Sequence, residues 1–309
     1  MFSRYQIEAA IINLQRGESV DEANDVINRW CKDRRSIKEA IDIITTSGDE
    51  NVVFAACPIA RRNINQNWTK YSESDREEIR SLLEERLVSF TGSDVILSQI
   101  ISVIVAIALK DWPDTWKTCV HDFIHSATNS QEMCILDMKI LSELIVTIHE
   151  TKDITNFTRR RLIKEFDKSS TEIMQMIDWS LENVGFDNIC SPVIKLLKEL
   201  CLTAPYENVI EPFMSSMLPA LFNTFATNEL CYQDAMTTIK NLLIERSDAK
   251  EIATQLFTET IQLFAGFCSS EEEVPYHILI FMMEYLTAYG PDIDEVCFEG
   301  EDIIEETSD

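Results

Sequence analysis

Amphipathic helical segments recur in pairs along almost the whole chain, and this recurrence restricts the fold more than any other feature of the sequence. In one segment Ile37, Ala40, Ile41 and Ile44 occupy the i, i+3, i+4 and i+7 positions that form one face of an α-helix. Breaks such as the one at Gly48 separate consecutive segments, and no alternating strand pattern competes with them. The pattern predicts helices over residues 8–14, 20–30, 36–46, 52–68, 76–90, 95–109, 115–127, 132–149, 158–181, 188–202, 209–225, 229–245, 249–267 and 274–289.

These segments form about seven pairs of roughly 40 residues each, which is the period of HEAT and armadillo repeats. A helical hairpin of this size cannot bury its apolar face alone, so neighbouring hairpins must stack. We therefore expect an all-α fold, a right-handed α-solenoid of about seven HEAT-like helical hairpins. A globular all-helical fold is the alternative, although it does not require so even a period. The expected regions are 1–120, 121–298 with further HEAT-like repeats, and an acidic, disordered tail over 299–309.

The charge balance limits the classes of partner. The chain has 53 Asp and Glu against 27 Lys and Arg, a net charge of -26. Because such a surface repels phosphate backbones and attracts basic proteins, we expect no direct binding to nucleic acid. The longest uncharged run, residues 95–109, is shorter than the roughly 20 apolar residues that a membrane-spanning helix requires. It predicts a buried core helix and no membrane segment.

The cysteines and histidines are the residues that could indicate catalysis or metal binding. Nine cysteines occur singly without a Cys-x-x-Cys spacing, which is typical of free thiols in a reducing compartment. His121 and His125 flank Asp122 at the spacing of zinc proteases, so a zinc hydrolase is one alternative. Against it, Asp122 is shorter than the usual glutamate base, and the other histidines, His149 and His277, are distant in sequence. The sequence also lacks a glycine-rich loop of the kind that binds phosphate groups. It therefore predicts no catalytic residue, no metal site and no cofactor, and we expect that the protein is not an enzyme.

Short basic clusters stand out against the acidic background at residues 32–35, 61–62 and 159–161. The first two fit helix C-termini, where positive charge is favourable, whereas the third lies near a helix start. For that third cluster we expect either an interhelical salt bridge or an acidic partner. Separately, Trp112-Pro113 is expected to end the helix over 95–109 and to open the next one near Thr115, with Trp112 and Trp116 packed over the joint.

Several of these segments resemble a known family. The sequences VINRW (26–30), NVVFAACPIARRNINQNW (51–68), REEIRSLLEERLVSF (76–90) and LSQIISVIVAIALKDWPDTW (97–116) are similar to the N-terminal region of importin-β superfamily transport receptors. In that family a helix ending in Trp, a Phe-Ala helix and a long apolar helix with a Trp-Pro-x-x-Trp turn follow in this order. The segment FTRRRLIKEFDKSSTEIMQMIDWSLEN (157–183) resembles the transportin-SR and importin-thirteen branch.

The resemblance implies a HEAT-repeat karyopherin that carries cargo through nuclear pores. It implies binding to the GTP form of the small GTPase Ran through inner helices of the first repeats, within residues 1–120. Those inner helices are 20–30, 52–68 and 95–109. Their polar positions Asn24, Asn28, Arg61, Arg62 and Gln99 are the candidate Ran contacts. The resemblance also implies binding to Phe-Gly repeats of the nuclear pore and to protein cargo, which is Arg-Ser-rich in the transportin-SR branch. It further implies that the protein shuttles between nucleus and cytoplasm.

Two function classes follow. The first is a nuclear transport receptor of the import type, or the N-terminal fragment of one, because the Arg-rich cargo helix of the transportin-SR branch lies in a later part of a much longer solenoid. The second is a HEAT-repeat scaffold for protein–protein contacts without transport activity. Binding to Ran that depends on the bound nucleotide is expected of the first and not of the second.

Overall fold

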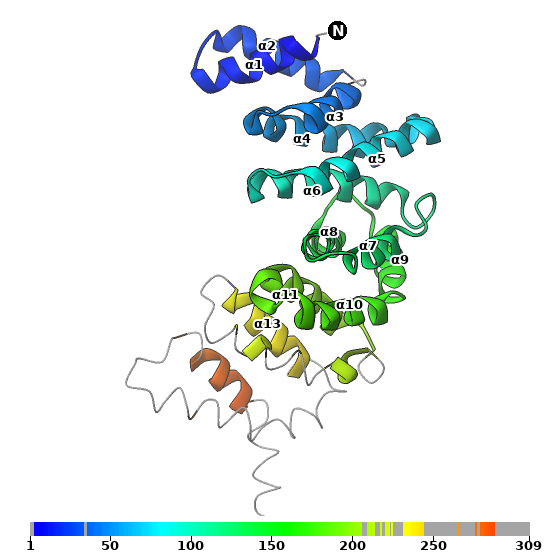
Figure 1. Ribbon diagram of the computed structural model, residues 1–309, viewed down its shortest axis with the longest axis vertical. Helices are drawn as coiled ribbons and strands as arrows, with labels where there is room; N and C mark the ends of the chain where they lie inside the picture. The colour runs from blue at the N-terminus through cyan, green and yellow to red at the C-terminus, as the bar shows by residue number, and fades with distance from the viewer. Residues whose placement is uncertain are drawn as a thin grey trace, which may run out of the picture. The chain divides into compact units, whose positions relative to one another are not determined.

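A computed structural model describes residues 3–33, 36–205, 209–213, 217, 220–222, 224, 231–243, 265, 276 and 279–287. Within these residues every regular element is a helix (Figure 1). The chain divides into two compact units, Met1–Ser169 and Ser170–Asp309. The predicted all-α class of stacked helical hairpins is confirmed.

The first unit is built from four helical hairpins and one further helix. Its packing joins α1 to α2, α3 to α4, α5 to α6 and α7 to α8 as hairpins, while α4 packs on α6, α6 on α8, and α3 on α5. Helices from successive hairpins therefore stack, as a repeat fold requires. The elements are α1 (Arg4–Arg16), α2 (Val20–Lys32), α3 (Ser36–Thr46), α4 (Glu50–Asn67), η1 (Trp68–Lys70), α5 (Glu73–Ser89), α6 (Asp94–Asp111), α7 (Cys119–Ala127), α8 (Gln131–Glu150) and α9 (Asn156–Asp167).

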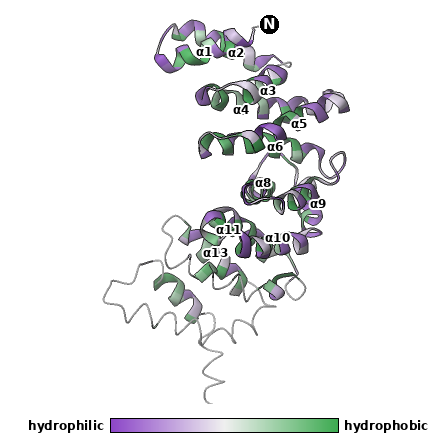
Figure 2. Ribbon diagram, in the orientation of Figure 1, coloured by the Kyte–Doolittle hydropathy of each residue, from purple (hydrophilic) through white to green (hydrophobic). Residues whose placement is uncertain are grey.

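Helix α6 forms the centre of this stack. It packs against α4, α5 and α8, and Ile100, Ile104 and Ile107 are completely buried. Figure 2 shows that mainly hydrophobic residues make up this helix. An apolar surface on nearly all sides is stable in water only when neighbours cover it, and each buried isoleucine side chain contributes about 2 kcal/mol. The prediction of a buried core helix is confirmed, and no helix among the described residues is long and apolar enough to cross a membrane.

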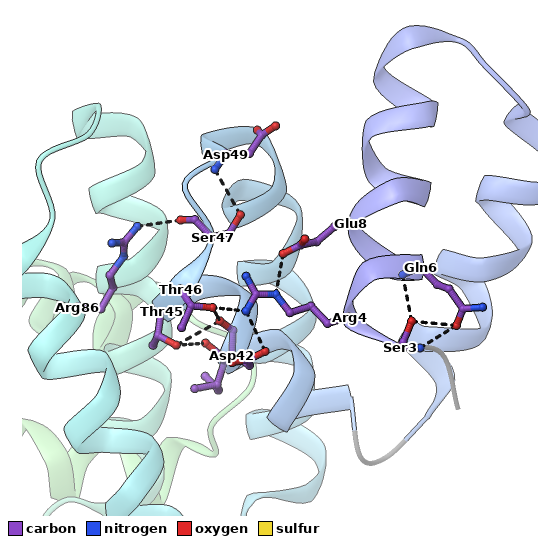
Figure 3. A network of polar contacts seen from close by, with 11 residues as sticks. Ser3, Arg4, Gln6, Glu8, Asp42, Thr45, Thr46, Ser47, Asp49 and Arg86 are labelled. Carbon is purple, nitrogen blue, oxygen red and sulfur yellow. Dashed lines mark hydrogen bonds and ion pairs between the residues drawn. The ribbon is translucent and has the colours of Figure 1, made fainter.

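Polar side chains join successive hairpins (Figure 3). Arg4 of α1 donates to Glu8 at 2.8 Å within its own helix and to Asp42 of α3 at 3.2 Å. Arg86 of α5 donates to the carbonyl oxygen of Ser47, just after α3, at 3.2 Å. Because the ion pairs of Arg4 are partly hydrated, they contribute little stability and act mainly in alignment.

Local signals in the sequence set several helix ends. Gly17 ends α1 in the left-handed conformation with φ +71°, and Glu18 N–H then donates to the Asn13 carbonyl at 2.8 Å. This arrangement satisfies carbonyl groups that the helix end leaves open. At the start of α5 the Ser72 hydroxyl accepts from Asp75 N–H at 3.1 Å.

Removal of the Ser72 cap is expected to destabilise the first unit modestly. The variant Ser72→Ala should lower its free energy of unfolding by about 1 kcal/mol, because one N–H group of the first turn of α5 loses its acceptor. Urea denaturation followed by far-UV circular dichroism measures the change. Ser74→Ala, within the same helix, is the control, and an equal effect of both variants would contradict the capping role.

Two predicted helix boundaries were wrong. Helix α7 begins at Cys119 and not near Thr115, because the N–H groups of Thr115 and Trp116 both donate to the Asp111 carbonyl, at 2.7 and 3.0 Å. These bonds fold the intervening segment around the end of α6. Trp112 and Trp116 are buried there, as expected.

The predicted single helix over 158–181 is two helices, α9 and α10 (Ser170–Asn183). The chain turns where Ser169 N–H donates to the Phe166 carbonyl at 2.9 Å, and both Phe166 and Ser170 are buried. Helix α9 packs on α8 in the first unit, whereas α10 packs on α11 in the second. The break lets each half bury its own apolar face.

The described part of the second unit contains α10, α11 (Phe186–Thr203), η3 (Glu211–Phe213) and α13 (Tyr232–Leu243). Helix α11 packs on both α10 and α13, and Lys198 of α11 contacts Asp234 of α13 at 3.4 Å. The predicted helices over 209–225, 229–245, 249–267 and 274–289 lie partly outside the described residues, and the predicted tail over 299–309 lies wholly outside them.

Candidate partner-binding face

The five candidate contact residues occupy three helices of the first unit, as the sequence predicted. Asn24 and Asn28 are exposed on α2, and Arg62 is exposed on α4. Arg61 of α4 and Gln99 of α6 are half-buried. All five side chains therefore reach solvent.

Arg62 lies beside the end of α2. Burial raises the pKa of the Cys31 thiol, and the nearby Arg62 guanidinium partly opposes this rise. Asn28 precedes Cys31 by about one helical turn on α2.

Arg61 lies in a separate groove between α4, α6 and α8, with a volume of about 140 Å³. Asn24, Asn28, Arg62 and Gln99 do not line this groove. Its lining mixes charges of both signs with small apolar and hydroxyl groups, and includes Arg61, Asn65, Ser102, Lys110, Glu143 and Asp153. Such a mixture suits a polar protein surface better than a small apolar ligand.

Asn65 is a groove residue that the sequence analysis did not single out. Its side-chain amide donates to Asp153 at 3.2 Å, which joins α4 to the segment after α8. The available signal was its position four residues after Arg61, on the same helix face. Asp153 could not be related to it from the sequence, because 88 residues separate the two.

Other asparagines on α4 have structural roles. Asn63 is buried, and its amide donates to Ser36 Oγ at 2.7 Å and to the Ile59 carbonyl at 3.1 Å. Asn67 is also buried and accepts from Lys70 Nζ at 2.7 Å. Buried amides need such partners to offset the loss of water, so these residues belong to the helix packing.

The histidine pair does not form a recognisable metal centre. His121 and His125 are exposed on α7 with their rings stacked at a centroid distance of 6.1 Å. Asp122 accepts from Trp116 Nε1 at 3.1 Å and from Thr118 Oγ1 at 2.8 Å, which fixes the start of α7. Within the described residues no three His, Cys, Asp or Glu side chains are grouped to hold a metal, and His277 lies outside them.

The basic cluster at residues 159–161 is mainly structural. Arg159 donates through Nε to the Ile148 carbonyl at 2.9 Å and through Nη2 to the Thr151 carbonyl, so it satisfies the C-terminal end of α8. Arg161 forms an ion pair with Asp114, in the turn between α6 and α7. The expected salt bridge is therefore present for Arg161, although its partner lies in a turn and not on another helix, and Arg160 is exposed. In the first cluster, Arg34 and Arg35 lie outside the described residues. The expectation of a helix C-terminus is wrong for the second cluster, because α4 continues to Asn67 and has no basic residue in its last turn.

The cysteines of the described residues are free thiols. Five are buried and two, Cys31 and Cys231, are half-buried, while Cys268 and Cys297 lie outside the described residues. Burial raises the pKa of Cys57 to about 12 and that of Cys134 to about 11. Thiols so resistant to ionisation behave as small core residues and are poor nucleophiles.

Stacked helical hairpins of this kind define a helical-repeat protein. In sequence, residues 23–89 match the family described as Importin-beta N-terminal domain, and residues 93–239 match the family described as Exportin 1-like protein. Together with the fold, these matches support the importin-β superfamily of karyopherins for this chain. These are families of transport receptors and not of enzymes, in agreement with the expectation that the chain is no enzyme.

Individual relatives are distant. The chain is 21% identical to Protein EXPORTIN 1A of Arabidopsis thaliana over 272 residues, which is 85% of the chain and 23% of that protein. It is 18% identical to Exportin-1 of Drosophila melanogaster over 182 residues, which is 56% of the chain and 17% of that protein. The chain thus spans less than a quarter of the length of these relatives. Neither the families nor these relatives single out the transportin-SR branch.

Among solved structures, the fold is similar to that of Kap121p in the crystal structure of Kap121p bound to Nup53p. The TM-score is 0.64 at 14% sequence identity, and the match covers 92% of this chain and 26% of that one. At this identity the likeness establishes the helical-repeat fold.

Proposed function

We propose that the chain is a nuclear transport receptor, or the N-terminal segment of one, that binds the GTP form of Ran through α2, α4 and α6. One observation carries the proposal: the match to the importin-beta N-terminal domain spans residues 23–89, and four of the five candidate contacts, Asn24, Asn28, Arg61 and Arg62, lie in it and reach solvent. Gln99 lies in the adjoining exportin 1-like match.

The proposal includes further partners and a location. We infer that the chain binds Phe-Gly repeats of the nuclear pore and protein cargo, and that it shuttles between nucleus and cytoplasm. The likeness to Kap121p, which was crystallised with Nup53p, supports the inference of a pore partner. An import type with Arg-Ser-rich cargo rests on the resemblance of residues 157–183 to the transportin-SR branch, whereas the names of the relatives favour export.

Equilibrium binding to Ran tests the central claim. The 309-residue chain is titrated with Ran loaded with a non-hydrolysable GTP analogue and, separately, with Ran-GDP, at two salt concentrations. We expect a preference of about tenfold or more for the GTP form, which corresponds to at least about 1.4 kcal/mol. Equal binding to the two forms of Ran, or no binding to either, would contradict the proposal. The alternative would then be a scaffold protein that associates stably with some other protein.

A charge reversal on α4 tests the assigned face. The double variant Arg61→Glu and Arg62→Glu is expected to weaken binding to Ran-GTP by about tenfold or more, because it reverses the charge of two assigned contact residues and so changes the electrostatic match of this face to its partner. The matched control is Arg160→Glu with Lys164→Glu, two exposed basic residues on α9 outside residues 23–89. An equal loss in the control would indicate a general effect of net charge and would contradict the assignment to α4.

A further inference from the structure

A second groove in the first unit lies between α5, α7 and α8. It consists of two cavities of about 330 and 240 Å³ that share the lining residues Leu87, Val88, Met133 and Leu136. The shared residues make the cavities one continuous surface, which we call the α5/α8 groove. Its larger cavity is within the range of about 300 to 1,000 Å³ that ligand pockets occupy.

The walls of the α5/α8 groove are apolar and partly open to solvent. Val88 of α5 is 62% exposed, and Met133 of α8 is half-buried. Phe123 and Ile140 line the larger cavity, and Phe90 lines the smaller one. An exposed valine beside a hollow lined by methionine and aromatic rings offers contact area to a large apolar side chain.

The larger cavity is also acidic. Glu84 of α5, Asp122 of α7 and Asp137 of α8 line it, and no Lys, Arg or His is among its lining residues. Arg80 is near: its guanidinium stacks on the Trp116 ring at 4.7 Å, and it partly offsets the raised pKa of Glu84. In the smaller cavity Lys139 is paired with Asp94 at 2.9 Å and Glu132 adds another carboxylate.

Two of these carboxyl groups lack the hydration that stabilises a negative charge. Burial raises the pKa of Asp137 to about 7, with Glu84 adding to the rise and a hydrogen bond from Ser126 opposing it. Burial also raises the pKa of Glu84, with Asp122 contributing. A cation placed among these groups would replace the missing water and favour their ionised forms.

We propose that the α5/α8 groove binds a segment of a partner protein in which a large apolar side chain stands next to Lys or Arg. The apolar walls accept the large side chain, and the carboxylates of the larger cavity attract the adjacent cation. An acidic segment would be repelled, and a second copy of this chain would bring its own net charge of -26 against the same carboxylates. The proposal goes beyond the Ran-binding function, because none of the five candidate Ran contacts lines either cavity and the acidic cavity is formed by α5, α7, α8 and the turn before α7.

Three labelled peptides test the proposal by fluorescence anisotropy on the full 309-residue chain. Each carries one Phe in a Gly-Ser background, flanked by Lys on both sides, by Glu on both sides, or by Ser and Gly. We expect the Lys-flanked peptide to bind about tenfold more tightly than either other peptide. Its affinity should fall between pH 8 and pH 6, because Asp137 takes up a proton near pH 7.

A matched pair of variants locates the binding. Val88 and Val95 are both 62% exposed, but only Val88 lines the groove. We expect Val88→Lys to lower the affinity for the Lys-flanked peptide about tenfold and Val95→Lys to leave that affinity unchanged. The two variants should have equal thermal stability. No binding of any peptide, equal binding of the three, or an equal loss in both variants would overturn the proposal. Because Ran binding is measured separately on the same proteins, either claim can fail without the other.

Discussion

The variant Asp111→Ala is expected to destabilise the first unit by about 3 to 5 kcal/mol, the largest single loss that its polar contacts predict. Asp111 is 3% exposed at the end of α6. Its Oδ1 accepts from Trp68 Nε1 and from Arg76 Nη1, both at 2.9 Å. Its removal would leave the mostly buried Arg76 guanidinium without this counter-charge and the buried Trp68 indole N–H without its acceptor.

Denaturant unfolding followed by tryptophan fluorescence measures this loss, since four of the five tryptophans, 30, 68, 112 and 116, belong to the first unit. Asp114→Ala is the control, because Asp114 also pairs with an arginine but its side chain is 66% exposed to solvent. Water screens the exposed pair, so we expect little change in that variant. Equal destabilisation by the two variants would show that burial of the Asp111 pair is unimportant.

The variant Asp137→Asn is expected to make the first unit less sensitive to alkaline pH. In the folded chain the pKa of Asp137 is raised to about 7, above its value of about 3.9 in an unfolded chain. The folded state therefore holds this proton more tightly. Stability from the protonated carboxyl is fully present below about pH 4 and is lost as the pH rises towards 7, by an amount on the order of 4 kcal/mol.

The measurement compares the free energy of unfolding of the native chain and of Asp137→Asn at pH 5 and pH 8. Asparagine has a similar shape and no charge, so the variant should gain stability relative to the native chain at pH 8 and gain much less at pH 5. Glu77→Gln, an exposed position on α5, is the control for removal of a carboxylate. Parallel curves for the native chain and Asp137→Asn would contradict the raised pKa.

Helix positions were predictable where one short segment contains the whole signal. Residues 36–46 were predicted as a helix from Ile37, Ala40, Ile41 and Ile44, and α3 spans Ser36–Thr46. Those four residues are buried together, because the 3.6-residue period alone puts them on one face. The apolar run over 95–109 likewise required burial on nearly all sides, whichever helices covered it.

The candidate face was predictable in part. The sequence indicated which polar positions of α2, α4 and α6 lie off the apolar stripe, and those five residues do reach solvent. It did not indicate that Arg61 lies in one groove with Asn65 and that Arg62 lies beside α2. Adjacent residues on a helix point about 100° apart, so neighbours in sequence contact different surroundings.

The sequence by itself determined the all-α class, the pairing of helices and the buried nature of α6, because periodicity and apolar content are local properties of the chain. The tertiary structure decided the start of α7, the break between α9 and α10, the Trp68–Asp111–Arg76 contacts and the acidic α5/α8 groove. Each of these depends on groups that only stacking brings together: Asp111 meets Trp68 across 43 residues and Arg76 across 35. Helical period specifies which face is buried, and the packing of one hairpin on the next specifies what that face meets.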